Sequence, residues 1–368
     1  MTPDPGLASW LQLTLTPGLG ASTIRNLLRQ FGLPESVIAR KRELAAYATP
    51  EALEALHSQA VRAQVDRALR WAGEPGHFIV TLADDFYPRA LLEIPDPPSL
   101  IYAHGRIDLL QRSCLAIVGS RNATAQGESN AASFAKALSN AGLTIVSGLA
   151  VGIDAAAHRG GLEGAGSTIA VLGTGIDVLY PKRNSELAGR IAAQGLLLSE
   201  FPLGTGPVAS NFPRRNRLIS GLAQGCLVIE AALDSGSLIT ARTSAEQGRD
   251  VFAIPGSIHS PVSKGCHALI KSGAKLVESA EDVLAELSAF RGSGYASTTG
   301  GEALPEANSA AGLLAHMGHD PVDVDSLCAR AGMSAEQVAS ELLHLELEGT
   351  VAALPGGLYQ RLANRQSG

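Results

Sequence analysis

The chain has 368 residues, of which 45% are hydrophobic, 17% are charged and 4% are aromatic, and its formal net charge is −6. This length exceeds what one hydrophobic core usually organises, so two or three domains are expected. The 40 glycines fit a globular α/β protein with many tight strand-to-helix turns. The acidic balance argues against non-specific adsorption to nucleic acid, so any such binding must depend on locally focused positive charge.

Targeting signals and cysteine motifs are absent from the sequence. No run approaches the roughly 18 apolar residues of a membrane span, and the first ten residues lack a signal-peptide pattern, which predicts a cytoplasmic protein. The four cysteines form no CxxC pair and are predicted to be reduced core residues without metal or disulfide: Cys114, Cys226, Cys266 and Cys328.

Residues 1–76 are predicted to form a small helical domain, because apolar residues recur at helical spacing on both sides of a glycine turn. The turn Pro17-Gly18-Leu19-Gly20 resembles that of a helix-hairpin-helix, in which a helix N-terminus can hold a DNA phosphate. A turn inside a SAM-like bundle is an equally good interpretation.

Residues 77–288 are predicted to form an α/β domain with a parallel sheet. After a strand at Phe78–Leu82 and a proline-punctuated connection, short apolar runs alternate with helical stretches, which is typical of strands buried on both faces. The predicted strands are 115–118, 143–146, 168–172, 196–198, 227–229, 251–254 and 275–277.

Glycines follow the first three of these parallel strands. Gly119-Ser120-Arg121, Gly148-Leu149-Ala150 and Gly173-Thr174-Gly175 would all lie at the carboxyl edge of the sheet, where open α/β sheets bind ligands. Each turn would present backbone N–H groups near a helix N-terminus, so we predict phosphate binding at this edge.

Common enzyme motifs are missing. The glycine spacing does not fit GxGxxG, and there is no GxxxxGK[ST] loop and no GxSxG elbow. Asp154 and His158 are interpreted as a helix-start carboxylate and a packed or surface histidine rather than metal ligands. A paired-carboxylate hydrolase stays open, although no spacing selects a pair among the acidic residues near strand ends, which are Asp177, Glu200, Glu230 and Asp234.

The segment 210–222 concentrates positive charge. Its sequence Ser-Asn-Phe-Pro-Arg-Arg-Asn-Arg-Leu-Ile-Ser-Gly-Leu is predicted to be a loop leading into an apolar helix. Arginine contacts phosphate and stacks on bases, and the neighbouring Phe212 could stack on an unpaired base, which favours single-stranded nucleic acid. Arg121, Lys182 and Arg183 would extend this basic track, while the alternative is a set of surface ion pairs.

Four motifs in succession resemble the DprA/Smf family. They are Ala116-Ile117-Val118-Gly119-Ser120-Arg121, Ser147-Gly148-Leu149-Ala150-x-Gly152-Ile153-Asp154-x-x-Ala157-His158, Phe212-Pro213-x-Arg215-Asn216-Arg217-Leu218-Ile219-Ser220-Gly221-Leu222 and Glu230-Ala231-x-x-Asp234-Ser235-Gly236-Ser237-Leu238-Ile239-Thr240-Ala241. The resemblance is strong over residues 78–286.

The resemblance implies a non-enzymatic protein without a cofactor. Its centre would be an extended Rossmann-like domain that binds single-stranded DNA without sequence preference, forms homodimers and loads RecA during natural transformation and recombination. A single-strand-binding protein is considered as a further partner. No catalytic residue is assigned, and the expected DNA-binding residues are Gly119, Ser120, Arg121, Gly148, Lys182, Phe212, Arg214, Arg215, Asn216, Arg217, Gly236, Ser237 and Thr240.

The C-terminal part is predicted to be a linker over residues 289–308 and a winged-helix domain over 309–368. Glycine, serine and threonine dominate the linker. Helices are expected at 310–317, 324–331 and 335–348, followed by strands at 351–353 and 358–360. The third helix carries glutamates and no Lys or Arg, so we expect a protein contact or a stabilising role rather than groove binding.

Two other functional classes remain as alternatives. One is a nucleotide-hydrolysing enzyme of the lysine-decarboxylase-like Rossmann group, whose Pro-Gly-Gly-x-Gly-Thr loop is only loosely matched by residues 234–240. The other is an interaction scaffold in which the glycines serve only tight turns. Fold alone cannot separate these classes.

Overall fold

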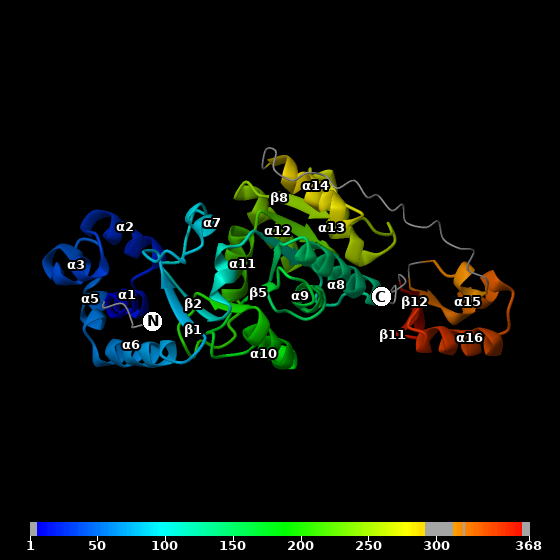
Figure 1. Ribbon diagram of the computed structural model, residues 1–368, viewed down its shortest axis with the longest axis horizontal. Helices are drawn as coiled ribbons and strands as arrows, with labels where there is room; N and C mark the ends of the chain where they lie inside the picture. The colour runs from blue at the N-terminus through cyan, green and yellow to red at the C-terminus, as the bar shows by residue number, and fades with distance from the viewer. Residues whose placement is uncertain (1–5, 291–311, 319–320, 363–368) are drawn as a thin grey trace.

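The computed structural model describes residues 6–290, 312–318 and 321–362. Along the chain it forms a helical bundle, a large sheet with helices on both faces, and a small unit that combines helices with a three-stranded sheet (Figure 1). This is the predicted α/β architecture with a helical part before it and a winged helix after it. Within the described ranges, no helix is long and apolar enough to cross a membrane.

The N-terminal bundle packs in two directions. Leu13 belongs to the core of the bundle itself, whereas Leu11 on the same helix belongs to a second cluster, which includes Tyr102 and Leu172 of the central sheet region. The bundle is therefore fixed to the sheet by a shared apolar contact. Its helices are α1 (Leu7–Leu15), α2 (Ala21–Phe31), α3 (Pro34–Ala39), α4 (Lys41–Leu44), α5 (Pro50–Leu56) and α6 (Gln59–Ala72).

The central sheet has the order β1-β2-β6-β5-β4-β3-β7-β8-β9, parallel from β6 to β9. Its strands are β1 (His77–Thr81), β2 (Leu100–Gly105), β3 (Cys114–Val118), β4 (Thr144–Ser147), β5 (Thr168–Val171), β6 (Leu196–Ser199), β7 (Gly225–Val228), β8 (Asp250–Ala253) and β9 (Lys275–Leu276). The predicted strands are confirmed to within one or two residues. The order reverses between β4 and β7 around β3, which makes the end of β3 a topological switch point.

One strand was missed in the proline-punctuated segment. After the short helix α7 (Arg89–Leu92), strand β2 pairs antiparallel with both β1 and β6. The prolines do not disturb it because they all precede its first residue, so each ladder N–H is available.

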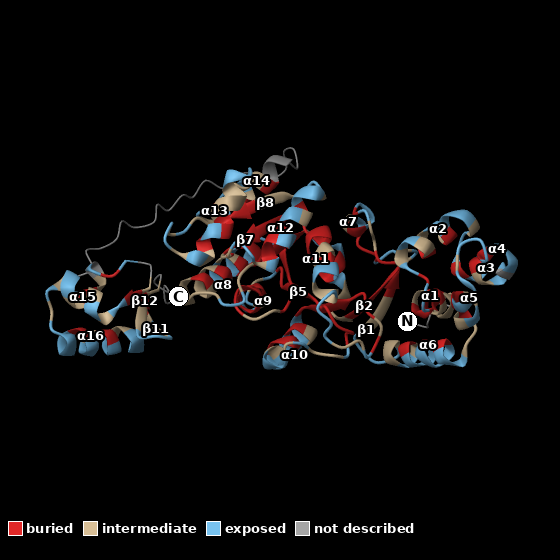
Figure 2. Ribbon diagram, turned by 180° about the vertical axis from the view of Figure 1, so that it is seen from behind, coloured by how far each residue is buried: buried red, intermediate tan, exposed pale blue. Residues whose placement is uncertain are grey.

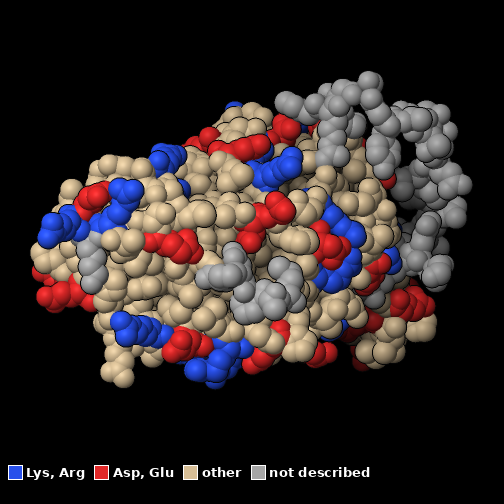
Figure 3. Space-filling model, turned by 60° about the vertical axis from the view of Figure 1, so that its left-hand side comes forward, with Lys and Arg blue, Asp and Glu red and all other residues tan. Residues whose placement is uncertain are grey.

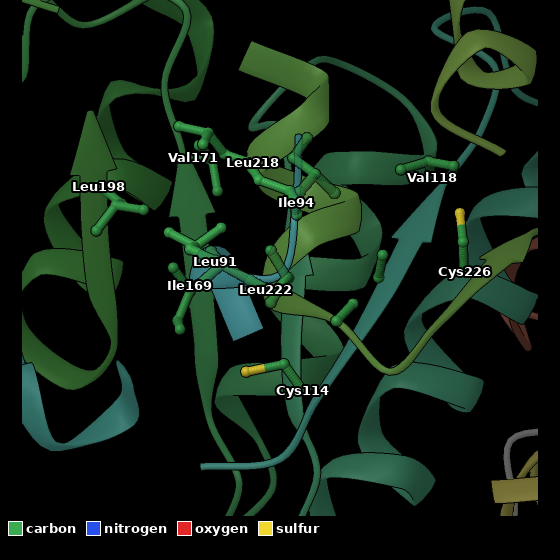
Figure 4. Close-up of a cluster of buried hydrophobic side chains, with 14 of the residues drawn as sticks. Leu91, Ile94, Cys114, Val118, Ile169, Val171, Leu198, Leu218, Leu222 and Cys226 are labelled. Atoms are coloured by element: carbon green, nitrogen blue, oxygen red, sulfur yellow. The ribbon is translucent and has the colours of Figure 1, made fainter. Parts of the chain in front are cut away.

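Helices cover both faces of the sheet, and the strands between them are buried (Figure 2). Residues of α7, α11, α12 and α13 pack on one face, and residues of α8, α9 and α14 on the other. In Figure 4, Leu91 and Ile94 meet Leu218 and Leu222 of α11 above the strands. The bounds are η1 (Ile107–Gln111), α8 (Ala125–Asn140), α9 (Ile153–Leu162), η2 (Lys182–Asn184), α10 (Ser185–Gln194), α11 (Asn211–Leu222), α12 (Gly236–Glu246), η3 (Pro261–Ser263), α13 (Lys264–Lys271) and α14 (Ala280–Phe290).

The C-terminal unit contains two of the three predicted helices, α15 and α16, and the wing strands. Its elements are η4 (Leu313–Ala315), β10 (Val322–Asp323), α15 (Val324–Ala331), α16 (Ala335–Leu347), β11 (Val351–Leu354) and β12 (Leu358–Arg361). The helix predicted at 310–317 is wrong for its described part, which holds only the 3₁₀ turn η4. The predicted linker lies outside the described residues apart from 289–290, which end α14.

Candidate nucleic-acid interface

A cavity of about 780 Å³ opens at the switch point of the sheet, between the segment that follows β3 and the one that follows β7. The start of α11 closes its third side. This is the edge where open α/β sheets bind ligands. The cavity is lined by Val118, Gly119, Ser120, Arg121, Asn122, Ala150, Asp154, Tyr180, Pro207, Ala209, Phe212, Pro213, Arg215, Asn216, Ile219, Ala232, Asp234, Ser235, Gly236, Ser237, Ile239 and Thr240.

Most of the residues expected to bind DNA line this one cavity. The lining includes Gly119, Ser120, Arg121, Phe212, Arg215, Asn216, Gly236, Ser237 and Thr240. The others, Gly148, Lys182, Arg214 and Arg217, lie outside the lining. Segments more than 100 residues apart in the sequence therefore meet at the edge that the strand pattern predicted.

The arginine-rich segment is helical rather than a loop. Helix α11 already begins at Asn211, and Pro213 is tolerated because it sits in the first turn, where an N–H has no partner inside the helix. Consecutive helical residues point about 100° apart. The arginines consequently face different directions, and the prediction of one continuous arginine loop is wrong.

Arg215 points into the protein. Its side chain is only 5% exposed, and its guanidinium donates to the carbonyl oxygens of Gly148, at 2.7 Å, and Val171. Burial lowers the pKa of Arg215 to about 10, and Asp154 opposes that shift. Gly148 leaves room for this contact, because a Cβ there would lie 2.7 Å from the Arg215 guanidinium and would require it to shift. Arg215 therefore ties α11 to the ends of β4 and β5.

The glycine turn after β4 is occupied by groups of the protein itself. The N–H groups of Gly148 and Ala150 both donate to Oδ2 of Asp154, at 3.1 and 3.3 Å. Burial raises the pKa of Asp154, against the opposing influence of Arg215 and these N–H groups. An internal carboxylate thus accepts from the N–H groups that we predicted to hold a phosphate, so the structure does not favour a phosphate at this turn.

His158 completes the same turn. Its Nε2 accepts from the Leu149 N–H at 3.3 Å, and its Nδ1 lies 2.7 Å from Oγ1 of Thr168, which donates onward to the Ile145 carbonyl. Because that hydroxyl is already a donor, Nδ1 must carry the imidazole proton. Complete burial lowers the pKa of His158 to about 3, so the ring is neutral. This confirms the interpretation of His158 as a packed residue, here an uncharged one.

The turn after β3 differs because its arginine faces outward. The N–H of Ser120 donates to the carbonyl of Glu230 at 2.7 Å, so this N–H is not available to a phosphate. The next residue, Arg121, is exposed on the cavity wall. Opposite it, α12 begins with Gly236, and a helix N-terminus favours anions. A guanidinium and a helix N-terminus thus meet across the cavity.

Arg121 is part of a small aromatic surface. Its guanidinium carbon lies 5.9 Å from the ring centre of Phe212, whose ring lies 5.6 Å from that of Tyr180. Phe212 packs closely over Gly173, where a Cβ would lie 2.7 Å from the ring. Tyr180 was not predicted as a site residue. Together the rings offer flat faces beside a cation.

Arg214 and Arg217 lie on the other side of α11. Both contact Oε2 of Glu200, Arg214 at 3.3 Å, and Arg217 also pairs with Asp96 at 3.5 Å. Arg25 of the helical bundle binds the same Asp96. This network connects three parts of the fold, which are the bundle, the segment before β2, and α11. Arg217 therefore mainly stabilises the packing of these parts.

The remaining predicted groups are distributed as follows. Lys182 is exposed in η2, two residues after Tyr180. Glu230 accepts from the N–H and hydroxyl of Thr124, and Asp177 accepts from the Gly204 N–H.

In the described part of the chain, no cluster of His, Cys, Asp or Glu could hold a metal ion. Basic and acidic side chains are interspersed over the face in Figure 3, so positive charge is not spread broadly there.

Comparisons with known proteins agree with this architecture. Residues 78–288 match the family model of DNA recombination-mediator protein A, and residues 300–357 match that of the DprA winged helix domain. Protein Smf of Escherichia coli is 44% identical over 310 residues, which cover 82% of each chain. DNA processing protein DprA of Streptococcus pneumoniae is 52% identical over 206 residues, covering 56% of this chain and 73% of the relative.

Solved structures give the same result. The crystal structure of S. pneumoniae DprA matches with a TM-score of 0.61 and 40% identity, covering 75% of this chain and 95% of that one. DNA processing protein A of Helicobacter pylori, whose single-stranded DNA binding mode has been described structurally, matches with a TM-score of 0.53 and 29% identity over 58% of this chain and 96% of that one. The chain therefore belongs to the DNA recombination-mediator protein A family, also called DprA/Smf.

Proposed function

We propose that the protein binds single-stranded DNA, without sequence preference at this site, in the cavity at the end of β3. The contact between Arg121, Phe212 and Tyr180 carries the proposal, because it places a cation beside aromatic faces at the mouth of a ligand-sized cavity. Aromatic stacking reads no sequence, and duplex DNA does not expose its base faces.

The backbone of the strand would be held by two groups. Arg121 binds one phosphate through its guanidinium, and the start of α12, with Gly236, Ser237 and Thr240, receives a neighbouring phosphate. Gly119 and Ser120 shape the floor of the cavity, Asn216 lines it, and Lys182 extends the positive edge. The contacts expected of Gly148, Arg214 and Arg217 remain predictions that this geometry does not favour.

Relatives support the ligand and the wider role. The similar protein of H. pylori binds single-stranded DNA. Family membership further supports a homodimer that passes the strand to RecA in natural transformation or recombination, with a single-strand-binding protein as a further partner. We also propose the domain division that the sequence predicts: a helical domain over residues 1–76, the Rossmann-like domain over 77–288, a linker over 289–308 and a winged helix over 309–368.

The residues that line the cavity favour DNA binding over hydrolysis of a bound nucleotide. Its lining includes two carboxylates, Asp154 and Asp234, and Asp154 is occupied with the N–H groups of its own turn. Only Asp234 would be left to act, whereas acid–base hydrolysis usually needs a pair of groups. Incubation with nucleoside monophosphates should release no free base; release at a steady rate would favour the enzyme alternative.

The test is a fluorescence anisotropy titration of the full chain with a labelled oligo-dT and a duplex of equal length at several salt concentrations. Affinity for the single strand should exceed that for the duplex and should fall with salt, at a log–log slope of about −0.7 for each phosphate neutralised. Equal affinity for both forms, or binding that salt does not weaken, would contradict the proposal. The scaffold alternative predicts no salt-dependent binding at all.

A further inference from the structure

Helix α16 presents two leucines to solvent. Leu343 is 60% exposed and Leu347 is 79% exposed, which is more than any other large hydrophobic side chain in the described ranges. Because they lie four residues apart, they share one side of the helix. The buried side of α16 packs Val338 and Leu342 into the core of the winged helix, and neither exposed leucine belongs to that core. The two leucines therefore form a small apolar surface that needs another explanation.

The surroundings of these leucines are acidic. Glu336 lies seven residues before Leu343, and Glu346 lies three residues after it, so both belong to the same side of the helix. Both glutamates are exposed, and α16 contains no Lys or Arg. Residues 321–362 as a whole hold six Asp or Glu and two Arg. A complementary surface must therefore be basic, with small or apolar side chains between its charges. We call Glu336, Leu343, Glu346 and Leu347 the α16 face.

A surface of that kind lies on helix α6 of the N-terminal bundle. This helix carries three arginines and one aspartate, and its exposed side includes two small residues, Ala60 and Ala63. Arg67 donates to a backbone carbonyl of the segment after β6. Arg62 and Arg70 are exposed and form no ion pair within the described ranges. We call Ala60, Arg62, Ala63 and Arg70 the α6 face.

The two faces match in shape as well as in charge. Helix α6 has 14 residues and α16 has 13, so each is about 20 Å long. The leucines of α16 form a ridge, and the short alanine side chains of α6 leave a groove, which is how packed helices fit together. In such a contact the arginines of α6 lie beside the glutamates of α16.

The two faces of one chain do not meet. Helices α6 and α16 lie at opposite ends of the long axis, along the same edge of the molecule (Figures 1 and 2). The outer side of each helix is exposed in Figure 2. The C-terminal unit contacts the central domain at α8, where the Gln126 N–H donates to Oε1 of the buried Gln360 at 3.3 Å. The partner of the α16 face is therefore another molecule.

We propose that the α16 face binds the α6 face of a second copy of this chain. The contact is head-to-tail, because unlike surfaces of the two copies meet and each copy keeps one face open to a further copy. It is distinct from the homodimer proposed from family membership. One helix from each copy makes a small interface, so the contact is transient in the free protein.

Copies that share one DNA strand strengthen this contact, and this part of the inference rests on the proposed function. Two chains held on the same strand have a high effective concentration for each other, so a weak contact becomes populated. A long strand should then fill cooperatively. A short oligomer that holds a single copy should bind as if the contact did not exist.

The experiment detects the contact by crosslinking two differently tagged full-length chains in the absence of DNA. One chain carries Ala63→Cys on α6 and the other carries Ala339→Cys on α16, both at exposed positions. A short bismaleimide reagent should join the two chains in the mixture, and neither variant alone should give a dimer, because a head-to-tail contact brings unlike positions together. The native chain, with its half-buried Cys328, gives the background. A mixture that yields no more than this background overturns the proposal.

Charge reversal tests whether the two faces recognise each other. Arg62→Glu with Arg70→Glu in the first chain should lower the crosslink yield about tenfold, because two attractive pairs at exposed sites become repulsive. Adding Glu336→Arg with Glu346→Arg to the second chain should restore the yield. Arg29→Glu on α2, on the other side of the bundle, is the control and should have little effect. An unchanged yield after the first reversal, or no recovery after the second, contradicts the pairing.

The leucines are tested in the same assay. Leu343→Ser with Leu347→Ser should also lower the yield, because the apolar ridge is lost. Both residues are exposed, so the midpoint of thermal unfolding should stay near the native value and show that the variant folds. A full yield from this folded variant would show that the α16 face is not the contact.

Strand binding keeps this inference separate from the proposed function. The native chain should bind a long oligo-dT cooperatively, whereas the chain with Arg62→Glu and Arg70→Glu should lose cooperativity and keep its affinity for a short oligo-dT. If no oligomer binds but the crosslinks form as described, the proposed function fails and the contact stands. If both chains fill the long strand with equal cooperativity, the contact has no role on DNA and that part of the inference is wrong.

Discussion

Two turns at the same edge of the sheet both begin with glycine, but different side chains surround them. The turn after β4 is closed, because Asp154 and His158 accept from its N–H groups and Arg215 covers it from α11. The turn after β3 leaves Arg121 exposed beside Phe212. A glycine-rich turn therefore indicates where backbone N–H groups could bind an anion. The surrounding side chains determine whether a carboxylate of the protein occupies that place, as Asp154 does, or whether it stays open to a ligand.

The largest expected effect is on stability at the closed turn. Arg215→Ala would remove the donors to the Gly148 and Val171 carbonyls and leave Asp154 buried without its cation. Leaving a buried polar group without its partner costs about 1–3 kcal/mol, and this variant leaves two carbonyls without a donor; urea unfolding would measure the loss. Arg121→Ala is the matched control and should change the unfolding free energy by less than about 0.5 kcal/mol. Equal losses in the two variants would show that the turns do not differ.

A pH effect should follow from His158. Its pKa is about 3 in the folded chain and near its usual 6.5 when unfolded, so below pH 6.5 protons bind the unfolded state preferentially. The stability that this group contributes is present above pH 6.5 and is lost as pH falls toward 3. Between pH 7 and pH 5 the loss should be about 2 kcal/mol. His158→Asn should lack this part of the decline in urea unfolding, and an unchanged decline would argue against a buried neutral ring.

At the open turn, the expected effect is on binding. Arg121→Ala should weaken oligo-dT binding by about 1.5 kcal/mol, the value of a charge-assisted hydrogen bond. Its salt slope should become shallower by about 0.7, since one phosphate contact is lost. Arg159→Ala makes the same charge change at an exposed residue paired with Glu128 on α8, so it serves as a control. If both variants bind equally well, Arg121 makes no phosphate contact.

A substitution at Tyr180 allows the contribution of base stacking to DNA affinity to be separated from that of charge. The side chain is 45% exposed, and Tyr180→Ala would shorten the aromatic surface next to Phe212. Affinity for oligo-dT should fall by about 1 kcal/mol, the lower end of a base-stacking contribution, with an unchanged salt slope. A change of slope in the anisotropy titration would instead indicate that the variant disturbs a phosphate contact.

The smallest effect is expected at the C-terminus. Helix α16 carries Glu336, Glu341 and Glu346 and contains no Lys or Arg, so it should be repelled by phosphate. Deleting the chain from Gly301 onward should leave single-strand affinity within a few-fold of the native value. Loss of most of the binding would place DNA contacts in the winged helix.

The fold could be predicted further than the site. Short apolar runs and glycine turns are local signals, and they located the parallel strands and the cavity edge. The direction of each arginine in α11 could not be predicted, because it depends on where the helix begins and on buried partners such as the Gly148 carbonyl, which lies 67 residues before Arg215. Strand β2 was missed for a different reason: the prolines just before it predict an irregular connection, and they hide the short strand that follows.

The most direct test of the proposed site is photo-crosslinking of the full chain to an oligomer that contains iodouracil, followed by identification of the modified residues by mass spectrometry. Stacking in the cavity at the end of β3 predicts crosslinks at Phe212 or Tyr180, reduced by Arg121→Ala and unaffected by Arg159→Ala. Crosslinks confined to α15, α16 or the wing strands, with both aromatic residues unmodified, would contradict single-strand binding at the end of β3.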